Sequence, residues 1–102
     1  MFNDYEKHFN EEARLVILAA LLEEADYRLN DNLLAKVLQV YGINRGRDYV
    51  RNQLAWLEKN TGAVRLVKAG EAVIAEITEI GIDHVEKRTV LSGVMRPSAS
   101  RS

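Results

Sequence analysis

The residues best suited to contact another molecule are the six cations between positions 45 and 68 and one amide among them, in an otherwise acidic chain. They are Arg45, Arg47, Arg51, Asn52, Lys59, Arg65 and Lys68. An arginine presents a planar fork of N–H donors that matches two phosphate oxygens or a guanine edge, and an asparagine amide can pair with adenine. Residues 45–68 hold six Lys or Arg against two Asp or Glu, whereas residues 1–44 hold four against eight and residues 69–102 four against five. This segregation favours phosphate contacts, and the alternative is an ordinary solvated helix face.

A helix expected over residues 46–60 would position most of these side chains. At about 100° per residue, Val50, Leu54 and Leu57 fall on one stripe that can face a core. Arg47 and Arg51 lie on one flank of that stripe. The opposite side carries the polar residues Asp48, Asn52 and Lys59, with the small residue Ala55 among them. Such a face suits insertion into a groove.

The neighbouring segments place this helix in a helix-turn-helix. Residues 31–41 carry apolar side chains at spacings of three and four, follow Asn30 as an N-cap and end at Gly42. A connection of about four residues then leads to the helix over 46–60. Beyond it, the β-rich runs 63–68 and 71–77 flank a tight turn and predict a hairpin.

Three shorter predictions complete the chain. A helix is expected over residues 11–25 with Asn10 as its N-cap, an edge strand over 27–29, and a last helix over 79–88. The order predicts a mainly α, α+β winged helix-turn-helix fold: a three-helix core with a β-hairpin wing and a C-terminal helix. We expect this domain to cover residues 1–88 and a flexible C-terminal tail to cover residues 89–102.

The sequence offers little for catalysis or metal binding. It has no cysteine, its four serines all fall at positions 92 to 102, and His8 and His84 are 76 positions apart. His84 sits beside Asp83 on a helix where both can be solvent-exposed. A nucleophilic triad cannot be assembled and a metal site lacks ligands, so we expect no enzyme activity, no cofactor and no metal.

The first apolar helix suggests a second copy of the chain. Eight consecutive apolar residues, Leu15 to Leu22, go twice round a helix. Such a helix lies under several elements or offers a second apolar face to another copy, and we favour a homodimer. The expected interface consists of Leu15, Ile17, Leu18 and Leu22. The run is far shorter than the roughly 20 residues of a membrane span, so no membrane partner is expected.

The large aromatic residues are expected in the core. Tyr41, Tyr49 and Trp56 fall at or beside apolar stripes, where burial is a more common role than stacking on bases.

Three motifs resemble a known family. They are residues 47–58 (Arg-Asp-Tyr-Val-Arg-Asn-Gln-Leu-Ala-Trp-Leu-Glu), residues 75–81 (Ala-Glu-Ile-Thr-Glu-Ile-Gly) and residues 93–97 (Gly-Val-Met-Arg-Pro). The chain resembles the small winged-helix proteins of Mu-like bacteriophages and prophages over nearly its whole length, and more distantly the ArsR and MarR repressors. The resemblance implies a winged helix, a phage origin and the cytoplasm of a bacterial host cell. One departure is the hairpin tip, Ala69-Gly70-Glu71, because the repressors often carry basic residues there.

Together these features predict a DNA-binding protein of phage or prophage origin, a transcriptional regulator that places helix 46–60 in the major groove of double-stranded DNA. The alternative is a protein-interaction module, a phage assembly or host-takeover factor that uses the winged helix only as a scaffold. The net charge of −1 favours the alternative.

Overall fold

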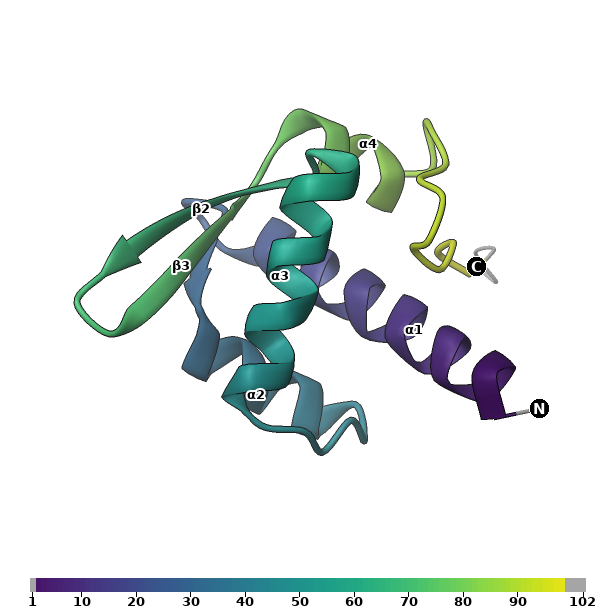
Figure 1. The fold of residues 1–102 in the computed structure, drawn as a ribbon. Helices are drawn as coiled ribbons and strands as arrows, with labels where there is room; N and C mark the ends of the chain where they lie inside the picture. The colour runs from purple at the N-terminus through teal and green to yellow at the C-terminus, as the bar shows by residue number, and fades with distance from the viewer. Residues whose placement is uncertain (1, 99–102) are drawn as a thin grey trace.

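A computed structural model describes residues 2–98, which form four helices and a three-stranded antiparallel sheet (Figure 1). In chain order the elements are α1 (Phe2–Glu23), β1 (Arg28–Asn30), α2 (Asp31–Val40), α3 (Arg47–Thr61), β2 (Val64–Ala69), β3 (Ala72–Ile77) and α4 (Glu79–Val85). The hairpin β2–β3 projects beyond the helices and follows α3 directly (Figure 1). This arrangement confirms the predicted winged helix-turn-helix fold.

The short strand β1 joins the hairpin to the helical part of the domain. The strand order is β1-β3-β2, and Ala75 of β3 pairs with Leu29 on one side and Leu66 on the other. The predicted edge strand is therefore confirmed, shifted by one residue. Because an isolated hairpin is marginally stable, this third strand helps to fix the hairpin against the helices.

Helix α1 begins well before the predicted start at residue 11. Asn10 does not cap it. Instead, the Asn10 side-chain oxygen accepts a hydrogen bond from the hydroxyl of Tyr49 at 2.6 Å, and the ring of Phe9 packs edge-on against that of Tyr49. The preceding residues continue the helix because contacts with α3 stabilise it there, which local capping rules do not capture.

The core lies between α1 and the elements that cover it. Fully buried side chains come from α1 (Ile17, Leu18, Leu21), α2 (Leu34, Leu38) and α3 (Val50, Leu54, Leu57). The stripe predicted for α3 is therefore confirmed. Tyr49 and Trp56 are half-buried against this core, but Tyr41 is 62% exposed, so its predicted burial is wrong. Tyr41 follows the last residue of α2, where the chain turns away from the core.

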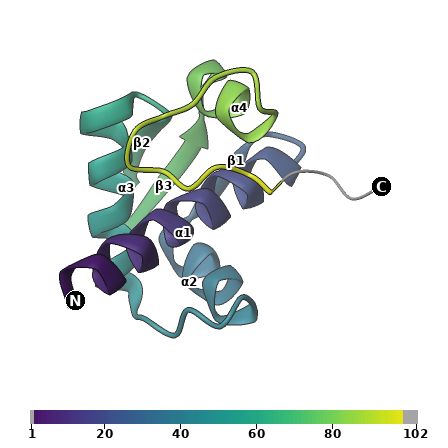
Figure 2. The same ribbon diagram turned by 90° about the vertical axis from the view of Figure 1, so that its right-hand side faces the viewer.

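The segment 89–98, which the sequence assigned to a flexible tail, packs on the domain. Figure 2 shows it leaving α4, passing beside α3 and returning along α1. Val94 is buried, the Met95 amide donates to the carbonyl of Glu11, and the carbonyl of Gly93 accepts from Arg14 Nη1 at 2.8 Å. We call residues 89–98 the strap. Residues 99–102 of the predicted tail lie outside the described residues.

His84 anchors the strap and is not exposed, although its place beside Asp83 on a helix allowed exposure. The side chain is fully buried; its Nδ1 accepts from the Leu91 amide at 3.0 Å, and its Nε2 lies 2.8 Å from the carbonyl of Met95. An amide can only donate, so Nδ1 is the unprotonated nitrogen and Nε2 carries the proton. A neutral imidazole thus satisfies two backbone groups of the strap.

Trp56 is the surface on which the strap rests. The Arg14 guanidinium lies 3.6 Å from the centre of its ring, and a Cβ built on Gly93 would come within 2.4 Å of its Cη2 atom. Gly93 also has φ +88°, which L side chains rarely adopt. Position 93 therefore requires glycine for both backbone and space.

We predict that Gly93→Ala lifts the strap from Trp56. The variant should lose on the order of 2 kcal/mol more unfolding free energy than Gly70→Ala in urea titrations, because the added methyl overpacks against the ring. Gly70 is the matched control, since it also has a positive φ but nothing lies within 4 Å of a Cβ built there. Trp56 is the single tryptophan, so its fluorescence should shift to longer wavelength in the Gly93 variant alone. Equal losses and unchanged emission would contradict this contact.

Candidate nucleic-acid interface

Helix α3 displays the predicted polar face to solvent. Asn52, Ala55 and Lys59 are exposed on the side opposite the buried stripe, and α3 lies across the front of the molecule in Figure 1 with the hairpin beside it. The buried face contains one polar side chain, Gln53, whose Oε1 accepts from Arg14 Nε at 2.8 Å. That bond ties α3 to α1 and leaves the outer face of α3 accessible.

Arg47 and Arg51 are both paired with one buried carboxylate of the same chain. Arg47 Nε lies 3.1 Å and Arg51 Nε 2.5 Å from Oδ2 of Asp31, which is completely inaccessible to solvent. The other oxygen of Asp31 accepts the Asn32 amide at 2.9 Å. About a third of each arginine side chain remains exposed. These pairings occupy part of each guanidinium, and the expected contact of Arg47 and Arg51 with guanine edges or phosphates stays a prediction.

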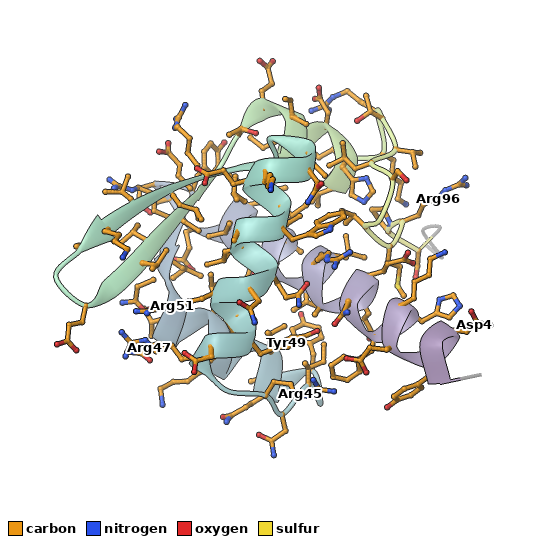
Figure 3. The ribbon with its side chains drawn as sticks, in the orientation of Figure 1. Asp4, Arg45, Arg47, Tyr49, Arg51 and Arg96 are labelled. Atoms are coloured by element: carbon orange, nitrogen blue, oxygen red, sulfur yellow. The ribbon has the colours of Figure 1, made fainter. Side chains whose placement is uncertain are left out.

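The same two arginines also hold the hairpin. The Nη2 atoms of Arg47 and Arg51 both donate to the main-chain carbonyl of Glu71, in the turn between β2 and β3. Figure 3 shows the two side chains together between α3 and the base of the turn. The arginine pair therefore links α2, α3 and the hairpin through two acceptors.

A cleft opens where the pair meets the hairpin. It is lined by Arg47, Asp48, Arg51, Lys68, Gly70, Glu71 and Ala72. The lining holds three cations, Arg47, Arg51 and Lys68, against two carboxylates, Asp48 and Glu71. Asp31 does not line the cleft, but it pairs with both arginines and supplies a third negative charge. With Asp31 counted, the formal charges balance, unlike those of the linear segment 45–68.

The arginines keep Asp31 ionised. Burial alone would raise the pKa of the Asp31 carboxyl, but the hydrogen bonds and positive charges of Arg51 and Arg47 outweigh it, so that the pKa lies below its ordinary value. The pair is thus a charged network, with two guanidinium groups around one carboxylate.

Arg45 and Arg65, also predicted to contact DNA, are engaged elsewhere. The Arg45 guanidinium lies 4.3 Å from the ring centre of Phe9 and 5.0 Å from that of Tyr49, and one of its nitrogens is 3.9 Å from the carboxylate of Glu6. Arg65 is 3.4 Å from the carboxylate of Glu76 on β3. Both side chains remain partly open to solvent, so these contacts are weak.

Three predicted residues are exposed and form no ion pair or side-chain hydrogen bond with any other residue between 2 and 98. They are Asn52, Lys59 and Lys68. Lys68 lies on the hairpin and lines the cleft, whereas Lys59 lies in the last turn of α3. Sequence reasoning missed Asp31 as the ion-pair partner of Arg47 and Arg51. The sequence did hold a signal for the burial of Asp31, because its spacing to Leu34 and Leu38 places it on the same face of α2 as these two core residues.

The predicted dimer residues divide into two groups. Ile17 and Leu18 are completely buried within one chain, because α1 lies under α2, α3, β3 and α4. They are therefore not available to a second copy, which corrects that part of the prediction. Leu15 and Leu22 are half-buried and pack against the rim of the core.

Between residues 2 and 98 there is no group of three or more His, Cys, Asp or Glu placed to hold a metal ion. None of the helices described here has the length and apolar character that crossing a membrane requires.

Comparison with known proteins agrees with the phage resemblance. The protein gp26 of Escherichia phage Mu is 34% identical over 97 residues, which cover 95% of this chain and 96% of gp26. The chain belongs to the gp26 family. A Haemophilus influenzae (strain Rd) protein is 32% identical over 76 residues, covering 74% of this chain and 72% of its own length. No family model matches the sequence, and no solved structure matches it. The more distant likeness to ArsR and MarR repressors stays a prediction.

We predict that Asp31→Asn destabilises the fold in a pH-dependent way. The pKa of Asp31 is lower in the folded chain than its ordinary value, so its ionisation stabilises the fold above about pH 4, and that stabilisation is lost as the pH falls through the folded-state pKa. At pH 7 the free energy of unfolding of the variant, measured in urea titrations, should be lower by on the order of 2 kcal/mol. This loss is smaller than for a wholly buried ion pair because solvent screens the arginines. The difference from wild type should shrink below about pH 4.

The matched control is Glu12→Gln, which removes an exposed carboxylate from α1 and should change stability by less than about 0.5 kcal/mol. A stability loss in Asp31→Asn that stayed constant from pH 7 to pH 3 would show that charge plays no part in the network.

Proposed function

We propose that this gp26-family protein binds double-stranded DNA, with α3 directed at the major groove and the hairpin beside the sugar-phosphate backbone. The observation that carries the proposal is the exposure of Asn52, Ala55 and Lys59 on α3 together with that of Lys68 on the hairpin. A winged helix uses these two elements, the second helix of the helix-turn-helix and the wing, to contact a duplex.

The arginine pair has a supporting role in this proposal. Arg47 and Arg51 are positioned by Asp31 and by the Glu71 carbonyl, which occupy one Nε and one Nη2 of each. Their remaining N–H groups can donate to a phosphate at the mouth of the cleft. In this proposal Arg47 and Arg51 therefore bind the sugar-phosphate backbone of the DNA and do not recognise bases.

The balanced charge of the cleft limits the affinity. Because carboxylates oppose the cations and the chain has net charge −1, long-range attraction to a polyanion is small. We therefore expect weak binding by a single chain, with a salt dependence set by the few phosphates that its cations contact. A regulator of transcription, the role implied by the repressor resemblance, would need a second subunit or a bent site to gain affinity.

We predict that Lys59→Ala combined with Lys68→Ala weakens DNA binding without affecting folding. Each lysine would neutralise one phosphate, so the slope of log K against log salt should fall by up to about 2, as measured by fluorescence polarisation on labelled phage DNA fragments. The matched control is Lys7→Ala with Arg96→Ala, which removes the same charge from exposed positions away from α3. Equal binding by both double variants, or no binding by wild type at about 50 mM salt, would overturn the proposal.

The second candidate function is a protein-interaction module. It is favoured by the internal pairing of Arg47 and Arg51 and by Val40, which is 84% exposed on α2. A photo-crosslinking amino acid at position 40 or at position 59 separates the two functions in phage-producing cells. Crosslinks from position 40 to one stoichiometric phage or host protein other than this chain, without DNA crosslinks from position 59, would favour the interaction module.

A further inference from the structure

Helix α2 carries a second apolar stripe on the side away from the core. Leu33, Val37, Val40 and Tyr41 recur at i, i+4, i+7 and i+8, the spacing of one helix face. Leu33 is 45% exposed, Val40 84% and Tyr41 62%, while Val37 is half-buried. We call these four residues the α2 ridge. Such a patch of exposed side chains marks an interaction surface.

A groove lies directly beside the ridge. Its volume is about 230 Å³, and it is lined by Val16, Ala19, Ala20, Glu23 and Glu24 of α1, Leu29 of β1, and Val37, Val40 and Tyr41. Ala19 and Ala20 make it concave because their side chains are small. Ridge and groove thus share one face of the domain, as a self-complementary contact about a two-fold axis requires.

Charges on this face are complementary as well. Glu23 and Glu24 line the groove, and Lys36 lies one helical turn before Val40, bordering the ridge. All three are exposed, and none forms an ion pair with another residue in the described range 2–98. When one ridge enters the groove of another copy, Lys36 of each chain can approach the acidic rim of the other.

We propose that the groove between α1 and α2 binds the α2 ridge of a second copy of this chain, forming a two-fold homodimer. The contact uses α2 and the outer side of α1, in place of the buried residues Ile17 and Leu18. Figure 2 shows α3 at the left edge and the C-terminal ends of α1 and α2 at the right, so the dimer leaves α3 of both chains accessible. The proposal does not depend on DNA binding.

Val40→Glu tests the apolar half of the contact. Sedimentation velocity should show wild-type dimers, and the variant should raise the dimer dissociation constant by at least about tenfold, because a charge would be buried in an apolar groove. Val90→Glu is the matched control, since Val90 is 61% exposed on the strap and should leave the dimer unchanged. A wild-type chain that stays monomeric up to about millimolar concentration, or equal effects of both variants, would overturn the proposal.

A charge exchange tests whether the partner is a copy of this chain. Lys36→Glu alone, and Glu23→Lys with Glu24→Lys alone, should each weaken the homodimer by placing like charges together. Mixing the two variants should restore dimers containing one chain of each, detected by native mass spectrometry. If mixing restores nothing, the predicted pairing of Lys36 with the acidic rim is overturned. Each measurement is made without DNA, so failure of the DNA-binding proposal leaves the result intact.

Discussion

The structure depends on the buried carboxylate of Asp31 and its two guanidinium partners. Asp31 lies in the first turn of α2, Arg47 and Arg51 lie one turn apart on α3, and both arginines continue to the carbonyl of Glu71 in the hairpin. A buried carboxylate is costly unless it is paired, so the angle between the helices and the position of the hairpin are fixed together. The elements that a winged helix presents to DNA are here one connected unit.

In this arrangement, the residues that stabilise the hairpin differ from the residues that are most accessible to a partner. Arg47 and Arg51 stabilise the hairpin and keep only part of their N–H groups for a partner. The amide of Asn52 and the ammonium groups of Lys59 and Lys68 are exposed and form no ion pair or side-chain hydrogen bond among residues 2–98. A lysine ammonium group is a strongly hydrated point charge and cannot form the bidentate hydrogen bonds of an arginine guanidinium. The exposed surface is therefore better suited to phosphates than to a specific base sequence.

The fold could be predicted from periodicity, because the stripe of Val50, Leu54 and Leu57 and the turn at Ala69-Gly70 are local signals. The strap could not, because its stability comes from contacts far apart in the chain, such as Arg14 with the Gly93 carbonyl. The charge count of residues 45–68 was correct, but a count cannot show which acids meet those cations after folding. Asp31 is 16 residues from Arg47, outside any window that measures local charge.

The strap has an evolutionary consequence. Residue 93 has no side chain because the six-membered ring of Trp56 fills the space where one would begin. A relative that carries a larger residue at position 93 must have a smaller one at position 56, or a strap that follows another path. The two positions are 37 apart in sequence, yet substitutions at one restrict those at the other. Within the gp26 family they should change together.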